Sequence, residues 1–412
     1  MKSDLDALMA AQNLDALMVV GSGQHNPYMV YLTGGGHLTQ AYVIKKRAAA
    51  PVLFHRSMER DEAARTGLDT FNLDKYDIMS IFRRNGGDWL ATNIEVYAKA
   101  LREAGAAQGR LAVFGQTDAG ESFAILDGLR HELPELEIVG QTGDNLLLTA
   151  MQTKEPAEIE RIRAMGRVTV DVVGEIADFL SRQQVQDEVL VKPNGQPLTV
   201  GDVKRRINLL LAERNVENPH GTIFAIGRDA GIPHSSGAAA DALRLGRTIV
   251  FDIFPAEAGG GYHYDFTRTW CLGYAPDEAQ ALYDDVHTVY RQIRSELRAG
   301  ALCGPYQDRT CALFEAQGHA TIKSDPAITA GYVHSLGHGL GLHIHENPKI
   351  SFSAGENDRL DPGVVVTIEP GLYYPERGMG VRLEDTVWVA PDGRIQTLVD
   401  YPMDLILPME NL

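Results

Sequence analysis

The chain has 412 residues and a formal net charge of −17, with 44% hydrophobic and 23% charged residues. A soluble chain of this length exceeds one ordinary core, so we expect two domains. The negative charge repels nucleic-acid phosphates and anionic membranes, so neither is expected as a partner. The three cysteines form no CxxC spacing, and the acidic N-terminus lacks the basic and apolar pattern of a signal peptide. We therefore expect a cytoplasmic protein.

The first part of the chain alternates helix-like and strand-like patterns, which predicts an α/β domain. Helices are expected at residues 5–12 and 98–104, and short strands at 16–20, 41–44, 52–54 and 111–114. The run Gly34-Gly35-Gly36 lacks the strand–GxGxxG–helix context of a dinucleotide site and is interpreted as a flexible turn.

A domain boundary is predicted near residues 149–155, which divides the chain into residues 1–150 and 151–412. Glu155-Pro156 has the features of a helix start, because proline fits the first turn and an acid suits the positive end of the helix dipole. Apolar residues continue at helical spacing from Ile159 to Ile176. A long amphipathic helix therefore opens the second domain.

Four strand-like segments of the second domain carry acids, at residues 248–254, 263–269, 364–371 and 380–385, and a helix is expected between them at 277–298. A buried, unpaired carboxylate costs several kcal/mol. A cap or an ion pair explains one such acid. Four of them together with one of the histidines His334, His338 or His345 in the glycine-rich loop 334–346 predict a divalent-cation site instead.

Four carboxylates and one imidazole can hold two ions about 3.5–4 Å apart. This ligand set favours Mn²⁺ or another hard ion over a thiolate zinc site, with Zn²⁺ and Co²⁺ left open. Two ions that share a hydroxide supply a nucleophile near neutral pH and polarise an amide carbonyl, which is a design for hydrolysis.

Further histidines lie close to the predicted ligands in the sequence. His334, His345 and His234 are candidates to donate to a substrate carbonyl or to a developing oxyanion. A satisfied structural histidine is the alternative for each. That alternative is favoured for His343, which is expected to lie with His345 on a strand.

Five motifs, in this order, resemble those of the pita-bread metallopeptidases, a family that includes methionine aminopeptidase, aminopeptidase P, prolidase and creatinase. The motifs are Val250-Phe251-Asp252, Tyr264-Asp265-Phe266-Thr267-Arg268-Thr269, His338-Gly339-Leu340-Gly341-Leu342, Thr367-Ile368-Glu369-Pro370-Gly371 and Gly380-Val381-Arg382-Leu383-Glu384-Asp385. The resemblance implies an α/β (α+β) fold. A small creatinase/prolidase-type domain would occupy residues 1–150, and a pita-bread catalytic domain residues 151–412.

The resemblance also implies a role for each ligand. Asp252 would bind one metal in bidentate fashion, Asp265 and Glu384 would bridge both metals, and His338 and Glu369 would complete the other shell. Glu369 further matches the family's proton shuttle.

Other positions match the substrate side of the family's proline-specific members. His234, His334 and His345 match their active-site histidines, and Arg382 matches an arginine near the C-terminal side of the substrate. Arg382 precedes Glu384 by two positions, so on a strand both would share one face. We expect Arg382 to pair with a substrate carboxylate; the alternative is that it neutralises surplus acid around the metals.

The function that these residues predict is a dinuclear-metal hydrolase that cleaves the bond before proline, in Xaa-Pro dipeptides or at the N-terminus of longer peptides. Alternatives are an aminopeptidase of the same fold without proline preference, a metal-free creatinase-like enzyme, and a lyase or binding protein that reuses the fold. Short proline-containing peptides are the expected partners. A homodimer is the expected assembly, with a tetramer left open. The Asp252–Asp265 spacing is longer than the family's commonest one, which predicts a longer hairpin tip.

Overall fold

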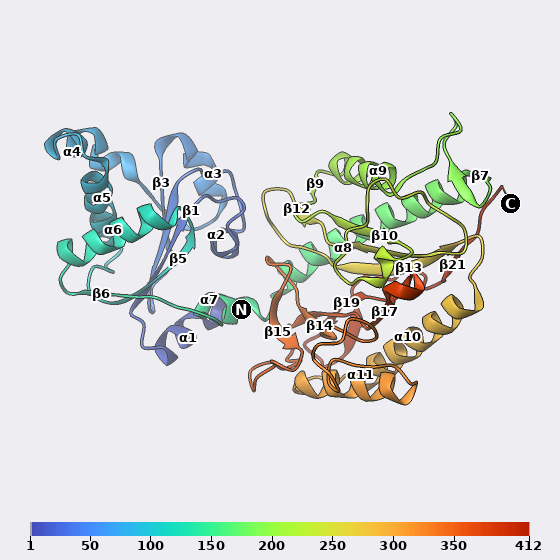
Figure 1. Cartoon of the computed structure of the whole chain (residues 1–412). Helices are drawn as coiled ribbons and strands as arrows, with labels where there is room; N and C mark the ends of the chain where they lie inside the picture. The colour runs from blue at the N-terminus through green and yellow to red at the C-terminus, as the bar shows by residue number, and fades with distance from the viewer. Residues whose placement is uncertain (1, 412) are drawn as a thin grey trace. The chain divides into compact units, whose positions relative to one another are not determined.

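The computed structural model describes residues 2–411 and divides the chain into two compact units (Figure 1). Unit 1 contains the residues up to Met151 together with Gly259–Gly261, and unit 2 contains Gln152–Ala258 and the residues from Tyr262 onward. Each unit has its own sheets and core. Within residues 2–411, every helix is too short or too polar to cross a lipid bilayer.

A six-stranded mixed sheet forms the centre of unit 1, in the order β4-β3-β2-β1-β5-β6. Its strands are β1 Ala16–Gly21, β2 Ala41–Lys46, β3 Val52–His55, β4 Asp69–Asn72, β5 Gly109–Gln116 and β6 Leu136–Val139. The four strands predicted from the sequence are confirmed as β1, β2, β3 and β5. The edge strands β4 and β6 are only partly buried, so their apolar pattern is weak.

The helices of unit 1 are α1 Leu5–Ala11, α2 Pro27–Thr33, α3 Arg60–Arg65, α4 Ile78–Arg84, α5 Trp89–Glu103, α6 Ala119–Glu132 and α7 Leu146–Met151, with 3₁₀ turns at Lys2–Asp4, Ser57–Glu59 and Leu73–Tyr76. Helix α5 starts well before the predicted residue 98, because the Asp88 carboxylate caps it by accepting from the backbone of Leu90 and Ala91. Gly34, with φ 82°, ends helix α2 in the left-handed conformation.

Unit 2 begins with the predicted long helix, α8 Pro156–Ser181, whose first turn is closed by Glu158 accepting from the backbone N–H of Glu155. The other helices are α9 Val200–Glu213, α10 Asp277–Glu296 and α11 Gly304–Ala316, with 3₁₀ turns at Asp229–Gly231 and Pro375–Arg377. Figure 1 shows the strands of this unit between the pair α8 and α9 and the pair α10 and α11.

Two larger sheets form the middle of unit 2. One has the order β10-β11-β13-β21 and the other β15-β14-β16-β19-β20, with β17 and β18 forming a separate hairpin. Their strands are β10 Thr222–Ile226, β11 Thr248–Ile253, β13 Phe266–Leu272, β21 Ile406–Leu407, β14 Gly337–Gly339, β15 Glu346–Ile350, β16 Val365–Ile368, β19 Asp385–Val389, β20 Ile395–Thr397, β17 Gly371–Tyr374 and β18 Met379–Arg382. Shorter pairs are β7 Gln184–Gln186 with β8 Val189–Val191, and β9 Val216–Glu217 with β12 Ala256–Glu257.

Several predicted strands of unit 2 end earlier or later than their sequence patterns suggest. The segment 364–371 splits into β16 and β17, because Glu369-Pro370 separates them, and 380–385 splits into β18 and β19. Strand β13 starts only at Phe266, so Asp265 lies just before it. The strand expected at His343 and His345 is wrong: residues 341–345 form a bent loop and β15 begins at Glu346.

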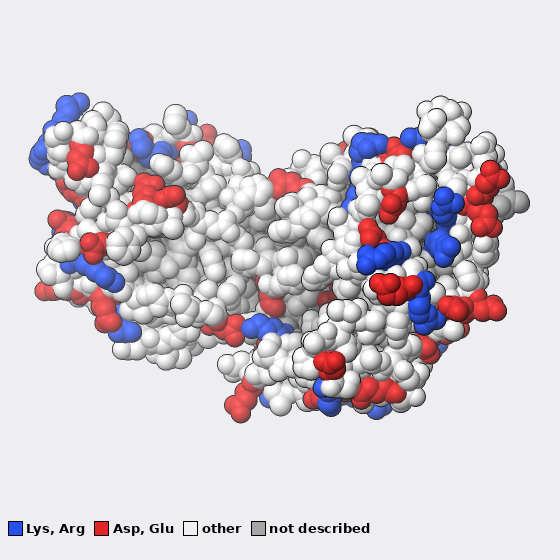
Figure 2. All heavy atoms as spheres, viewed as in Figure 1, with Lys and Arg blue, Asp and Glu red and all other residues white. Residues whose placement is uncertain are grey.

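Acidic and basic side chains are interspersed on the face of the molecule shown in Figure 2. The excess of acids is therefore spread over the visible surface of both units. This distribution suits solubility, as expected for the net charge of −17.

Candidate metal centre and its surroundings

The five predicted ligands lie on or next to different strands of unit 2. Asp252 lies on β11, His338 on β14, and Glu369 follows the last residue of β16. Asp265 directly precedes β13. Glu384 lies between β18 and β19, where its backbone forms an isolated β-bridge with Thr267 of β13. The ends of neighbouring strands therefore deliver these side chains from both large sheets to one place.

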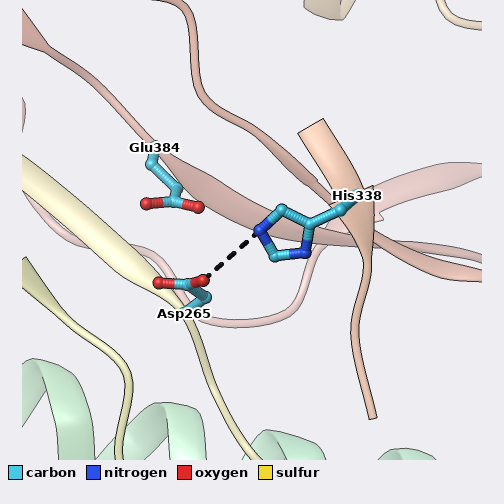
Figure 3. Close-up of side chains that lie close together, drawn as sticks. All are labelled: Asp265, His338 and Glu384. Carbon is cyan, nitrogen blue, oxygen red and sulfur yellow. Dashed lines mark ion pairs between the residues drawn. The ribbon is translucent and has the colours of Figure 1, made fainter. Parts of the chain in front are cut away.

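Three of the five predicted ligands converge closely. Asp265, His338 and Glu384 each offer a ligand atom, and these atoms lie within 4.8 Å of one another. Figure 3 shows the three side chains pointing toward one another. His338 Nε2 lies 3.6 Å from Asp265 Oδ2 and 3.4 Å from Glu369 Oε1. Asp252 lies in the same group but makes its own ion pair with Arg382.

The carboxylates of this group have oxygens without a donor. Among residues 2–411, Asp252 Oδ1, Asp265 Oδ1 and Glu384 Oε1 are buried and accept no hydrogen bond from the protein. A buried carboxylate oxygen needs a proton, a donor or a cation. Three such oxygens from three separate segments of the chain fit divalent metal ions, because carboxylates are the ligands that hard cations prefer.

Burial and mutual repulsion change the proton affinity of the group in the protein without metal. Burial raises the pKa of Asp265 well above its usual range, with added effects from Asp252 and Glu369. Burial also raises the pKa of Glu384 well above its usual range, helped by Asp265. Cations would remove this repulsion and return the carboxylates to their ionised form.

The remaining ligands show the same effect of burial. Burial raises the pKa of Glu369 to about 8, against the opposing charge of Arg382. Burial lowers the pKa of His338 to about 3, so its imidazole is neutral, which is the form that binds metals. Its Nδ1–H donates to the carbonyl of Gly339 at 3.0 Å, leaving Nε2 to face the carboxylates.

Arg382 lies at the end of β18 with a side chain that is only 3% exposed, and every nitrogen of its guanidinium contacts the protein. Nη2 donates to Asp252 Oδ2 at 2.6 Å, Nη1 donates to the hydroxyl of Tyr373 at 2.8 Å and to the carbonyl of Pro233 at 3.2 Å, and Nε donates to Thr267 Oγ1 at 3.3 Å. These contacts support the second of the two roles expected for Arg382, neutralisation of surplus acid.

His334 is held by two hydrogen bonds. Its Nδ1 lies 2.7 Å from the carbonyl of Ser335 and its Nε2 lies 2.9 Å from the hydroxyl of Tyr373. A carbonyl only accepts, so Nδ1 carries the proton, and Nε2 of the neutral ring accepts from Tyr373. Burial lowers the pKa of His334 to about 3, which keeps the ring neutral. Donation from His334 to a substrate stays a prediction, and it requires the ring to release Ser335.

The other two expected histidines are accessible to solvent. The rings of His345 and His338 have centroids 4.3 Å apart with an interplanar angle of 81°, and the side chains of His345 and His234 are both exposed. Burial lowers the pKa of His345, and the neighbouring His234 contributes to this effect. His345 and His234 therefore lie near each other beside the carboxylate group.

Two residues that the sequence analysis did not select take part in the site. Thr267 Oγ1 donates to Glu384 Oε2 at 2.6 Å, and Tyr373 links Arg382 to His334 through its hydroxyl. Thr267 is two positions after Asp265, so strand periodicity could have placed it on the same face. Tyr373 has no comparable signal, because its partners come from two other segments of the chain.

Comparison with known proteins places these residues in a family. The sequence profile of metallopeptidase family M24 matches residues 160–391. The Xaa-Pro dipeptidase of Pyrococcus furiosus is 30% identical over 194 residues, which cover 47% of this chain and 51% of that protein. The chain thus spans about half the length of this curated relative.

Solved structures of related proteins match nearly the whole chain. The Xaa-Pro dipeptidase from Bacillus anthracis superposes with a TM-score of 0.74 at 20% identity, covering 98% of this chain and 99% of that one. Dipeptidase PepE from Mycobacterium ulcerans superposes with a TM-score of 0.72 at 21% identity, covering 99% and 97%. These similarities confirm the expected α/β architecture, with a smaller domain before a pita-bread domain.

Proposed function

Because the chain belongs to metallopeptidase family M24, we propose that it is a dinuclear-metal peptidase that cleaves the peptide bond preceding proline. The observation that carries the proposal is the set of buried carboxylate oxygens without donors on Asp252, Asp265 and Glu384, beside the neutral imidazole of His338. Similarity to an Xaa-Pro dipeptidase supports proline as the residue after the cleaved bond.

Asp252, Asp265, His338, Glu369 and Glu384 would hold two divalent ions, for which Mn²⁺ fits best and Co²⁺ or Zn²⁺ are further candidates. When bound, such ions make water a nucleophile near neutral pH and polarise the substrate carbonyl. The protein contributes fixed positions. Thr267 orients Glu384, and Thr367 Oγ1 lies 3.4 Å from Glu369 Oε1.

Glu369 is the proposed proton carrier. Its Oε1 lies 3.4 Å from His338 Nε2, next to the proposed metal site, so the ionised carboxylate is placed to take up a proton there. A proline nitrogen leaves from a tertiary amide and must be protonated to depart. Glu369 Oε1 would accept the proton released on attack and deliver it to that nitrogen.

The histidines would bind the side of the substrate that leaves. His345 and His234 are exposed beside the carboxylate group, where an imidazole N–H can donate to the carbonyl or carboxylate of proline. His334 would line the same side, and Arg382 would balance the charge of Asp252. Proline has no N–H and a fixed φ, so a pocket can select it by shape and by offering no acceptor.

The remaining parts of the proposal concern the whole chain. Residues 1–150 would be a creatinase/prolidase-like domain and residues 151–412 the catalytic domain. We further propose a cytoplasmic homodimer that acts on short proline-containing peptides.

The decisive test uses the purified protein after incubation with Mn²⁺. Metal content and hydrolysis are measured with an Ala-Pro dipeptide, an Ala-Pro-Ala tripeptide and an Ala-Ala dipeptide. We expect bound metal and at least about tenfold preference for the proline substrates, because one pocket contact discriminates by about 1–3 kcal/mol. Equal cleavage of Ala-Ala would favour an aminopeptidase without proline preference, and protein that binds no metal would overturn the proposal.

A further inference from the structure

A buried ion pair lies next to the loop formed by residues 341–345. Lys154 Nζ is 2.7 Å from Glu346 Oε2, and the two side chains are 2% and 1% exposed. Lys154 precedes helix α8, whereas Glu346 opens strand β15, 192 positions later in the chain. Because taking both charges out of water offsets most of their attraction, such a pair contributes little stability over an apolar pair. The pair instead fixes the conformation of the neighbouring loop 341–345.

The carboxylate of Glu346 shapes the loop 341–345. Its Oε1 accepts from the backbone N–H of His343 at 3.0 Å. A Cβ atom added to Gly341 would lie 2.5 Å from Oε2, so the loop backbone lies directly against the carboxylate, and a side chain there would displace it. The carbonyl of Gly341 in turn accepts from the N–H of His263 at 2.8 Å. The loop is therefore built around the carboxylate.

Lys154 holds this carboxylate from a fixed position. Its backbone N–H donates to the carbonyl of Gly363 at 2.8 Å, and the preceding residue, Thr153, bridges to Val364. Strand β16 begins at the next residue and leads to Glu369. The backbone of Lys154 is thus anchored to the segment just before β16, the strand that leads to the proposed proton carrier, and the side chain extends from there to the loop.

The loop ends at His345, directly before Glu346. The other histidine nearby, His338, lies on β14, which pairs with β15, but it has supports of its own, since its backbone N–H donates to Thr367 Oγ1 at 3.1 Å and its Nδ1–H to Gly339. A change at Lys154 or Glu346 should therefore displace His345 more than His338.

We propose that Lys154 and Glu346 are positioning residues that fix His345 for contact with the peptide substrate. This inference rests on the proposed function of the site. Glu346 must accept from two donors at once, and Lys154 must neutralise it close to the other buried acids. An uncharged pair of the same volume would fill the space without holding the loop.

A double-mutant cycle tests the inference. Glu346→Gln and Lys154→Met are each made alone and together with His345→Ala, loaded with Mn²⁺, and assayed on Ala-Pro. We expect each single change to lower kcat about 10- to 100-fold with bound metal retained, because small misplacements of a catalytic group have effects of this size. In the His345→Ala background the further loss should stay below about twofold, because the pair acts through His345. Equal losses in both backgrounds, or loss of metal, would overturn the proposal.

The charge-free double variant Lys154→Met/Glu346→Gln guards against misfolding. It leaves no unpaired buried charge, so its melting temperature should recover relative to the single variants while its kcat stays low. Recovery of kcat along with stability would show that the pair is merely structural. Lys154→Arg should retain most of the activity, because it keeps the charge and the donor.

Two further measurements complete the design. Lys192→Met is the matched control, since Lys192 Nζ lies 3.1 Å from Asp202 Oδ2 in the same unit, and this variant should leave kcat unchanged. Hydrogen exchange at the amide of His343 reports on the loop without any turnover, and Lys154→Met should accelerate it. Unchanged exchange would overturn the positioning role even in an active peptidase, whereas wild-type protein inactive on all three peptides would contradict only the proposed function.

Discussion

Arg382 and Asp252 form a buried ion pair, with Nη2 and Oδ2 2.6 Å apart and side chains that are 3% and 11% exposed. Asp252 is also a proposed metal ligand through its other oxygen, Oδ1, which has no donor among the described residues. One carboxylate can therefore serve an arginine and a cation together. This relationship decides what the arginine can do for the substrate.

Arg382→Ala should impair cleavage of an Ala-Pro dipeptide and of Ala-Pro-amide by the same factor. The guanidinium is already engaged by Asp252, Tyr373 and Thr267, so it has no free edge for a substrate carboxylate. Steady-state kinetics on both substrates measures the ratio, and Arg377→Ala, from an exposed ion pair, is the control. A much larger loss on the dipeptide would restore the substrate-carboxylate role for Arg382.

Asp265→Asn or Glu384→Gln should abolish hydrolysis. Each removes a carboxylate charge from the centre of the group, and the loss should exceed the roughly 10²–10⁴-fold typical of one acid–base residue. Activity and metal content are measured together, with the exposed Glu376→Gln as the control. More than a tenth of the wild-type rate with full metal content would refute a dinuclear centre.

Glu369→Gln should lower kcat far more than it raises KM. The amide can still lie beside His338, but it cannot take up or release the proton that the leaving nitrogen needs. Full kinetic curves on Ala-Pro separate the two parameters. If KM rose while kcat stayed constant, Glu369 would be a ligand only.

Removal of metal should destabilise the protein more strongly as the pH rises. Burial raises the pKa of Glu369 from 4.5 to about 8, so in the metal-free protein its contribution to stability is present below about pH 4.5 and is lost as the pH rises through 8. The difference in melting temperature between metal-loaded and chelated protein should therefore widen from pH 5 to pH 8.

Glu369→Gln provides the control for this pH dependence, because an amide does not titrate. The chelated variant should show a smaller change in melting temperature over the same pH range than the chelated wild type. A gap between loaded and chelated wild type that is constant with pH would contradict the expected repulsion among the carboxylates.

Two of the proposed metal ligands, Asp252 and Glu369, could be selected from the sequence because each acid follows an apolar run, where an unpaired charge is costly. The local pattern around His343 was misleading, because the strand expected there is absent. There the carboxylate of Glu346 accepts a hydrogen bond from the backbone of His343 and pairs with Lys154. The contact between Lys154 and Glu346 joins distant parts of the chain, so it leaves no periodic signal in the sequence.

The sequence by itself determined which acids and histidines are available to the proposed site and their order along the chain, and local apolar patterns predicted most of the strands next to them. Only the tertiary structure decided how those groups share their partners. Arg382 pairs with Asp252, and Lys154 pairs with Glu346. Tyr373 is hydrogen-bonded to His334. In each case the two residues are far apart in the sequence. Such pairings depend on how sheets and helices pack, because a buried charge or polar group accepts whichever partner the fold brings within hydrogen-bond distance.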